Sequence, residues 1–183
     1  IGALQGFYGG HIDLFGQRAL EIWSGLPQLF ILIILASLIA PSFWSILLAL
    51  ALFSWTSLVG LVRAEVLKVR AQDYVRAARA LGAGNTRILW QHILPNALGP
   101  VIVAGTIDVA AAIIAESTLS FLGLGFPPDI PTWGRILFDS KDYLDIAPHW
   151  AIIPGMAIFL VVLSINYIGD GLRDALDPRI RGL

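Results

Sequence analysis

The sequence contains no cysteine, a single methionine and few charged side chains, which make up 14% of its 183 residues. The absence of cysteine excludes disulfides, cysteine-ligated zinc and thiol catalysis. Charged residues supply about a quarter of an ordinary globular chain, whereas hydrophobic residues here reach 57%. The formal net charge of −1 offers no overall attraction for nucleic acid. The composition therefore indicates a membrane protein rather than a soluble domain.

Two kinds of catalytic motif are also missing. The phosphate-binding pattern G-x-x-x-x-G-K-[ST] does not occur, and no glycine is followed by lysine, which excludes this route to nucleotide binding. No Ser/His/Asp cluster is apparent, and His11, His92 and His149 stand without metal-ligand spacing. We therefore expect a protein that is not an enzyme and that has no metal or cofactor site of its own.

The first residues are apolar and carry neither a methionine nor a basic segment, so no signal peptide is visible and we interpret the chain as a fragment. Residues 1–8 are too short to span a bilayer and are interpreted as the end of an upstream helix, broken by Gly9-Gly10. Residues 11–24 have amphipathic spacing. They form either a helix at the membrane interface or the polar first turns of the next span.

Four stretches are apolar enough to be spans, for which about 20 residues are needed. The clearest is 43–62, which is free of charge, and the shortest is 26–40, which reaches a sufficient length only with 21–25 added. The other two are 97–115 and 150–168. We therefore predict an all-α, polytopic membrane helix bundle with about four complete spans and the end of another.

The charges between the spans predict the orientation of the chain. Residues 63–92 carry six basic side chains against two acidic ones, whereas 128–148 carry four acidic side chains against two basic ones. Because basic loops stay in the cytoplasm, we expect 63–92 and the C-terminal tail, 169–183, on the cytoplasmic side and 128–148 on the opposite side.

The cytoplasmic segment reads as two short helices. Asp73 is predicted to cap a first helix over 74–81, which Gly82 ends in a left-handed conformation. Asn85 or Thr86 is predicted to cap a second helix over 87–93, which Pro95-Asn96 stop before the next span begins. From the residues alone, this segment is equally well an ordinary basic loop or a docking element, since its alanines permit close approach and its arginines fix orientation.

The motifs in this segment favour the second interpretation. The order Ala77-Ala78, three residues, Gly82, then Leu94-Pro95 resembles the EAA loop of binding-protein-dependent ABC importer permeases. Arg76 departs from the general pattern, which usually has Glu there, and His92 replaces the usual Ile.

The wider pattern resembles the dipeptide/oligopeptide/nickel branch of that family, and the similarity covers nearly all of the chain. The matching stretches are Arg63-x-Glu65, Asp73-Tyr74-Val75-x-Ala77-Ala78-x-Ala80-Leu81-Gly82, His92-Ile93-Leu94-Pro95-Asn96, Gly6-Phe7-Tyr8-Gly9-Gly10-x-x-Asp13, Leu119-Ser120-Phe121-Leu122-Gly123-Leu124-Gly125, Pro131-Thr132-Trp133-Gly134 and Gly171-Leu172-Arg173-Asp174-x-Leu176-Asp177-Pro178-Arg179.

The resemblance implies one transmembrane permease domain over 1–183 with a cytoplasmic coupling loop at 63–96. Because the family usually has six spans, we expect this domain to be incomplete at its N-terminus. It implies a bacterial inner-membrane protein that carries peptides or related small solutes. The implied partners are a second permease subunit, two cytoplasmic ATPase subunits that bind the ATP, and a periplasmic or extracellular solute-binding protein that docks on the outer segment. The ATPase-coupling residues carried over by position are Tyr74, Arg76, Ala77, Ala78, Arg79, Leu81, Gly82, Leu94, Pro95 and Asn96.

Asp108 and Glu116 are the acidic residues inside a predicted span, eight positions apart. This spacing places them about 80° apart on a helical wheel, and buried charges normally face water or a partner. We therefore expect them to lie along the translocation path or against the partner permease. The alternative function is a self-contained ion-coupled carrier or channel that uses these two acids. The sequence does not name the solute.

Overall fold

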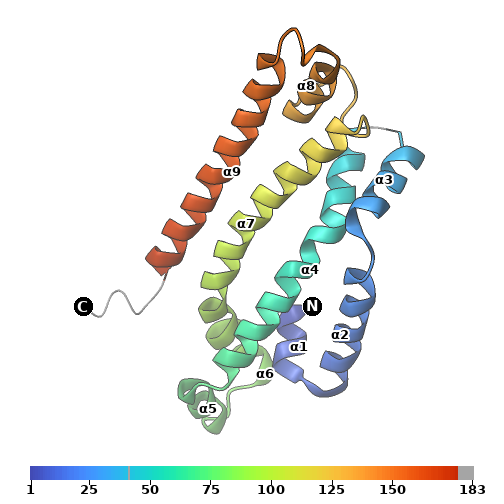
Figure 1. Cartoon of the computed structure of the whole chain (residues 1–183). Helices are drawn as coiled ribbons and strands as arrows, with labels where there is room; N and C mark the ends of the chain where they lie inside the picture. Colours follow the sequence, from blue (N-terminus) through green and yellow to red (C-terminus); the bar gives the residue numbers. More distant parts are fainter. Residues whose placement is uncertain (41, 177–183) are drawn as a thin grey trace. The chain divides into compact units, whose positions relative to one another are not determined.

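The computed structural model describes residues 1–40 and 42–176, which form helices joined by turns (Figure 1). No strand occurs in these two ranges. The elements are α1 (Gly2–Tyr8), α2 (Gly10–Ser24), α3 (Gln28–Leu38), α4 (Phe43–Arg70), α5 (Asp73–Ala80), α6 (Asn85–Arg87), the π-helix η1 (Ile88–Ile93), α7 (Leu94–Phe121), α8 (Trp133–Ser140), the 3-10 helix η2 (Lys141–Tyr143) and α9 (His149–Leu176). The predicted all-α class is confirmed.

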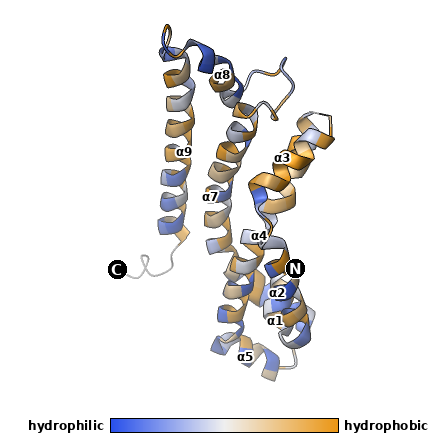
Figure 2. Cartoon of the chain, turned by 45° about the vertical axis from the view of Figure 1, so that its right-hand side comes forward, coloured by the Kyte–Doolittle hydropathy of each residue, from blue (hydrophilic) through white to orange (hydrophobic). Residues whose placement is uncertain are grey.

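Three helices are long and apolar enough to cross a membrane. They are α4 and α9, each of 28 residues, and the continuous helix Asn85–Phe121 of 37 residues, which comprises α6, η1 and α7. The pair α2 and α3 passes the same test only if it is counted as one broken span. The helices agree with the predicted membrane bundle of about four spans, and Figure 2 shows the apolar colouring that dominates α3.

The span predicted over 21–40, with an early kink at Pro27, is interrupted at that proline. Helix α2 ends at Ser24, and α3 begins at Gln28 and has only 11 residues, a length of about 16 Å. Pro27 lies at the break, in an extended conformation. Proline has no backbone N–H and disfavours the helical region for the residue before it, so the helix is interrupted there.

The end of the chain is more helical than the sequence indicated. Helix α9 continues past the predicted end of the last span and reaches Leu176. The motif residues Asp177-Pro178-Arg179 lie outside the described residues.

The contacts of the chain group into two compact units. The first comprises Ile1–Gly25, Trp55–Gly105 and Gly169–Leu183, and the second comprises Leu26–Ser54 and Thr106–Ile168. The single permease domain over 1–183 concerns the whole protein and stays a prediction.

In the first unit, a continuous apolar core joins α1, the end of α4, α5 and η1. Its members are Phe7, Val66, Val69, Val75, Ile88, Leu89, Ile93 and Ala97. Helix α1 also approaches α4 closely, because a Cβ on Gly6 would lie 2.8 Å from the Arg63 carbonyl oxygen. Burial of these side chains supplies the main stabilising free energy, about 1.5–3 kcal/mol for each large apolar side chain.

In the second unit, α3 and the first turns of α4 pack with the end of α7. Leu32, Ile46 and Leu119 are buried there and line one small cavity of about 20 Å³. The segment predicted as a polar loop, 128–148, contains α8 and η2. Thr132 caps α8, since its hydroxyl oxygen accepts a hydrogen bond from the Arg135 amide.

The first turn of α8 lies directly on α7. A Cβ on Gly134 would lie 2.4 Å from the Ser117 carbonyl oxygen and 2.7 Å from the Ser120 Cβ. A backbone oxygen cannot move aside as a flexible side chain can, so this contact requires glycine.

We expect Gly134→Ala to destabilise the protein by about 1–3 kcal/mol, the usual cost of overpacking. The measurement is the apparent melting temperature of the purified protein in detergent. The control is Gly155→Ala in α9, where a Cβ would meet nothing within 4 Å, so the melting temperature is expected to stay constant or rise. An equal decrease for both variants would contradict this account of the contact.

Candidate functional site

Helix α5 is held in place by one buried side chain. Val75 is 1% exposed and shares the core with Ile88 and Ile93, both 0% exposed. Helix α5 packs against η1, which follows it in the chain. Figure 1 shows α5 and α6 together at the end of α4. One face of α5 is thus fixed to the start of the long helix, and its other faces are free.

The turn that follows α5 is a Schellman motif. Gly82 has φ +85, the amide of Ala83 donates to the Ala78 carbonyl at 3.1 Å, and the amide of Gly82 donates to the Arg79 carbonyl at 3.0 Å. This pair of bonds closes the helix and requires a left-handed residue, which glycine adopts without strain. The predicted left-handed end at Gly82 is confirmed.

The predicted caps of both helices are wrong. Gln72 is the N-cap of α5, and Gly84 is the N-cap of α6, and neither makes a side-chain cap hydrogen bond. Asp73 lies one position further, in the first turn of α5. Its negative charge still lies near the positive end of the helix dipole. Asp73 therefore stabilises the start of α5 without acting as its N-cap.

The second predicted helix does not end before the span. Residues 88–93 form a π-helix that continues into α7 without a break. Pro95 lies in the first turn of α7, where the wider turn of η1 accommodates the proline. The Asn96 side-chain amide donates to the His92 carbonyl at 2.7 Å. The second predicted helix and the span are therefore one continuous helix, Asn85–Phe121.

The predicted coupling residues of α5 lie on its exposed faces. Tyr74 is 45% exposed and Leu81 is 88% exposed; Ala77 and Gly82 are exposed and Ala78 is half-buried. Partial burial raises the pKa of Tyr74, so its hydroxyl stays protonated at neutral pH. An apolar surface with small side chains is therefore available to another protein.

The two arginines of α5 differ in their contacts. Arg76 lies 3.5 Å from Asp73 and donates to the Ala71 carbonyl at 3.0 Å. Arg79 makes no ion pair or hydrogen bond within the described part of the chain. Further along, Leu94 packs on the core, whereas Pro95 and Asn96 are exposed.

An ion pair joins two motifs that the sequence analysis matched separately. The Arg63 guanidinium, on α4, donates through Nε and Nη2 to the two carboxylate oxygens of Asp13, on α2, with 2.6 Å for the Nη2 contact. Both side chains are largely buried, at 28% and 19% exposed. A bidentate arginine–carboxylate pair is strong and sets orientation, so α2 is fixed against α4.

A second arginine holds α1 against the end of α4. Arg70 Nη1 donates to the carbonyls of Gly6 and Phe7, at 3.1 and 2.6 Å. These carbonyls belong to the last turn of α1, where they have no partner within the helix. Since Phe7 also packs in the core with Val75, α1 stabilises the position of α5. We refer to Asp13, Arg63 and Arg70 as the brace.

Sequence reasoning missed the brace and one exposed aromatic side chain. It matched Asp13 and Arg63 to motifs without pairing them, because fifty residues separate the two in the sequence. Trp90, on η1, is 66% exposed, and a tryptophan in a helix gives no sequence signal for which face it occupies. Its exposure adds to the apolar surface near α5.

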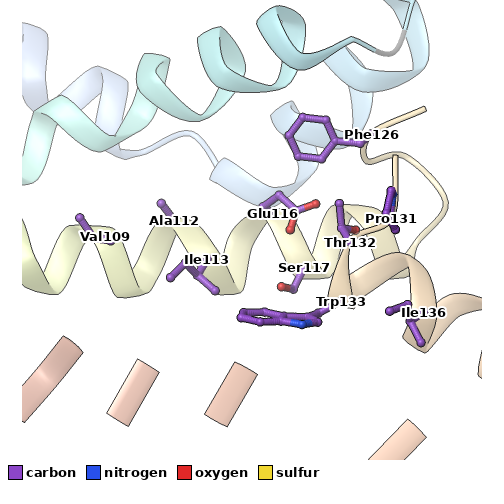
Figure 3. Close-up of a pocket in the computed structure, with 10 residues that line it drawn as sticks. All are labelled: Val109, Ala112, Ile113, Glu116, Ser117, Phe126, Pro131, Thr132, Trp133 and Ile136. Carbon is purple, nitrogen blue, oxygen red and sulfur yellow. The ribbon is translucent and has the colours of Figure 1, made fainter. Parts of the chain in front are cut away.

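The second unit contains a pocket beside α7, which Figure 3 shows in close-up. Its volume is about 530 Å³, within the range of small-molecule sites. Glu116 and Ser117 line it from α7, Phe126 and Thr132 from the connecting segment, and Trp133 from α8. We refer to it as the Glu116 pocket.

The structure separates the two acids of the predicted path. Glu116 lines the pocket and accepts a hydrogen bond from the Ser120 hydroxyl. Asp108 lies two turns earlier on α7, is half-buried and does not line the pocket.

In residues 128–148, both basic side chains, Arg135 and Lys141, have partners. Arg135 lies 3.2 Å from Asp139, and its guanidinium carbon is 4.9 Å from the Phe138 ring centroid. Lys141 Nζ is 4.0 Å from the same centroid. A further pocket of about 460 Å³ lies between α8 and the start of α9.

A family model described as "Binding-protein-dependent transport system inner membrane component" matches residues 1–182. The inner membrane ABC transporter permease protein YejE of Escherichia coli (strain K12) is 43% identical over 177 residues, which cover 97% of this chain and 52% of that protein.

Two further relatives have names that mention a solute. The dipeptide transport system permease protein DppC of Alkalihalophilus pseudofirmus is 40% identical over 181 residues, covering 99% of this chain and 60% of the relative. The glutathione transport system permease protein GsiD of Pectobacterium atrosepticum is 37% identical over 181 residues, with the same shares. The chain thus spans between half and two thirds of the length of these relatives.

The brace predicts a local loss of order on mutation. We expect Asp13→Asn to speed hydrogen exchange of the backbone amides of α1 and α2 several-fold, because the Arg63 guanidinium loses its charged partner. The measurement is hydrogen–deuterium exchange of the purified protein by mass spectrometry. In an Arg63→Gln background the same substitution is expected to add little, since paired groups are not additive.

The matched control is Glu65→Gln, on the same helix as Arg63. Glu65 pairs at 3.3 Å with Lys68, whose side chain is 66% exposed, and exposed pairs contribute little. Exchange in α1 and α2 is expected to stay constant. Equal acceleration by Asp13→Asn and Glu65→Gln would show that the brace is not what orders these helices.

Proposed function

Because this chain belongs to the family of inner membrane components of binding-protein-dependent transport systems, we propose that it forms half of the translocation path of an ABC importer. A second permease subunit forms the other half. The solute class is peptides or related small solutes, which fits the relatives named for dipeptide and glutathione transport. The permease carries out no catalysis, and ATP is bound and hydrolysed by two separate subunits.

The orientation of the proposed permease follows from its charges. The chain is a membrane protein by its family and its apolar helices. The basic segment at 63–92 and the C-terminal end then lie in the cytoplasm of a bacterial cell, and the acidic segment at 128–148 lies outside the inner membrane. A solute-binding protein docks on the outer segment that includes α8.

The observation that carries the proposal is the exposed face of α5. Its small residues allow a second backbone to come close, and Tyr74, Leu81 and the unpaired Arg79 surround them. Such a surface fits a groove on a cytoplasmic ATPase subunit. Apolar contacts supply the affinity, and the arginines set register and association rate.

The core that holds α5 gives this surface a way to act on the membrane helices. Val75 and Phe7 share one core with η1, and η1 continues into α7. A displacement of α5 by the ATPase is therefore transmitted through packed side chains rather than absorbed by a loose loop. Leu94, Pro95 and Asn96 form the start of the helix that moves.

A self-contained carrier or channel is the alternative that the sequence left open. It would use Asp108 and Glu116, but it has no use for an exposed small-residue face on a braced cytoplasmic helix. We therefore prefer the ABC permease and assign Asp108 and Glu116 to its path.

The coupling role of α5 is testable at Gly82. Proline fixes φ near −65° and lacks the N–H, whereas Gly82 has φ +85 and donates to Arg79. We expect Gly82→Pro to abolish capture of the ATPase subunits in a pulldown from membranes. Ala78→Glu is expected to do the same, because it places a carboxylate on the contact surface.

The matched control is Gly82→Asn. Asparagine tolerates the left-handed conformation, and a Cβ at this position meets nothing within 4 Å, so capture is expected to persist. Equal capture by wild type, Gly82→Pro and Ala78→Glu would refute the coupling role.

Asp108 is tested by uptake. If it faces the translocation path, Asp108→Asn is expected to lower ATP-driven solute uptake about ten-fold or more, with normal assembly of the importer, because its charge is removed without a change of shape. Unchanged uptake at normal expression would remove Asp108 from the path.

A further inference from the structure

Glu116 is an acid in a membrane-length helix without a basic partner. Its partner within the described chain is the Ser120 hydroxyl, which donates to Oε1; no lysine, arginine or histidine in these residues pairs with it. Ionisable groups in membrane-spanning helices normally face a cavity or a partner. Glu116 faces a pocket.

The walls of the Glu116 pocket are aromatic and aliphatic. Figure 3 shows the Glu116 carboxylate on the same side of α7 as the Phe126 ring, and the Trp133 indole on the other side, beside Ser117. Phe126 is held by a stacked contact with Phe43, at 5.9 Å between ring centroids. Aromatic faces attract cations, so the rings and the carboxylate favour the same kind of occupant.

A buried hydroxyl in the same wall also lacks a partner. Ser117 is 7% exposed, and its Oγ has no hydrogen-bond partner among the described residues. Leaving a buried polar group unpaired costs about 1–3 kcal/mol. An occupant that carries several N–H donors would satisfy it.

The chemistry of the pocket discriminates between classes of occupant. An anion would be repelled by Glu116. A hard metal cation prefers six or more oxygen ligands, whereas the pocket offers one carboxylate and two hydroxyls, and the Thr132 oxygen already accepts from Arg135. An organic ammonium needs one counter-ion, a few acceptors and apolar walls.

We propose that the Glu116 pocket binds the primary ammonium group of the solute during its passage, with Glu116 as the counter-ion. This inference rests on the proposed function and deepens it, because it assigns to the permease itself a preference for solutes with a free amino group. Glu116 is a specificity-determining residue, and the Phe126 ring, on the same side of α7, contacts the bound cation.

The first test is ATP-driven uptake by the full importer in proteoliposomes, with saturating solute-binding protein. The probes are alanyl-alanine and its N-acetylated form, which lacks the positive charge. We expect Glu116→Gln to lower alanyl-alanine uptake about ten-fold and to leave uptake of the N-acetylated peptide at its wild-type rate. Glu116→Asp is expected to restore most of the alanyl-alanine uptake. Glu21→Gln, which alters an exposed carboxylate paired with Arg18 on α2, is the control and is expected to leave both rates unchanged.

The second test does not depend on transport. A hydrophobic carbodiimide modifies carboxyl groups in apolar surroundings, and modification of Glu116 in the assembled importer is followed by mass spectrometry. Alanyl-alanine is expected to slow the modification several-fold, and the N-acetylated peptide is expected to have no effect.

The outcomes separate the two proposals. Absence of ATP-driven uptake of either probe by the wild-type importer would overturn dipeptides as a solute of the proposed importer and this inference with it. Normal wild-type uptake that Glu116→Gln leaves unchanged would overturn the inference alone. Equal loss of both probes, with loss of the second permease subunit from the purified complex, would also overturn it and would assign Glu116 to the contact between subunits. Equal protection by both peptides would contradict the ammonium as the group recognised.

Discussion

The burial of Val75 against Ile88 and Ile93 is the contact on which the position of α5 depends. Without this contact, the eight-residue helix α5 would not be fixed in one orientation, because short isolated helices are marginally stable in water. With it, α5 is fixed along one face and leaves its small residues exposed. The same core includes Phe7 of α1, and Arg70 donates a hydrogen bond to the Phe7 carbonyl. Helix α1 therefore also stabilises the position of α5.

Much of this unit could be predicted from the sequence, and the limits have physical causes. Gly82 was predicted because few residues adopt a left-handed conformation, and the apolar runs were predicted because a bilayer sets their length. Asp73 as a cap was wrong by one position, since a charge near a helix end is favourable at several positions. The Asp13–Arg63 pair could not be derived, because fifty residues separate its members and only the packing of α1 on α4 brings them together.

The second unit shows a different limit. Glu116 was singled out by its charge in an apolar run, but its pocket exists only because 128–148 folds into α8 and returns to α7 at Gly134. The Thr132 cap was the available signal for that helix. Asp108 and Glu116 looked equivalent on a helical wheel, and the pocket distinguishes them. A carboxylate, two rings and an unpaired hydroxyl then define a chemical preference that no single residue indicates.

The π-helix between α6 and α7 has a consequence for how such a protein can change over time. A π turn contains more residues than an α turn, and one residue corresponds to about 100° of rotation in an α-helix. The angular offset between α6 and α7 is therefore set within Ile88–Ile93. Deletion of a single residue there would rotate α6 relative to α7 about the helix axis, while every other residue of the chain stays the same. Packing limits which residues this stretch can contain, whereas the rotation of α7 about its axis limits how many residues it can contain.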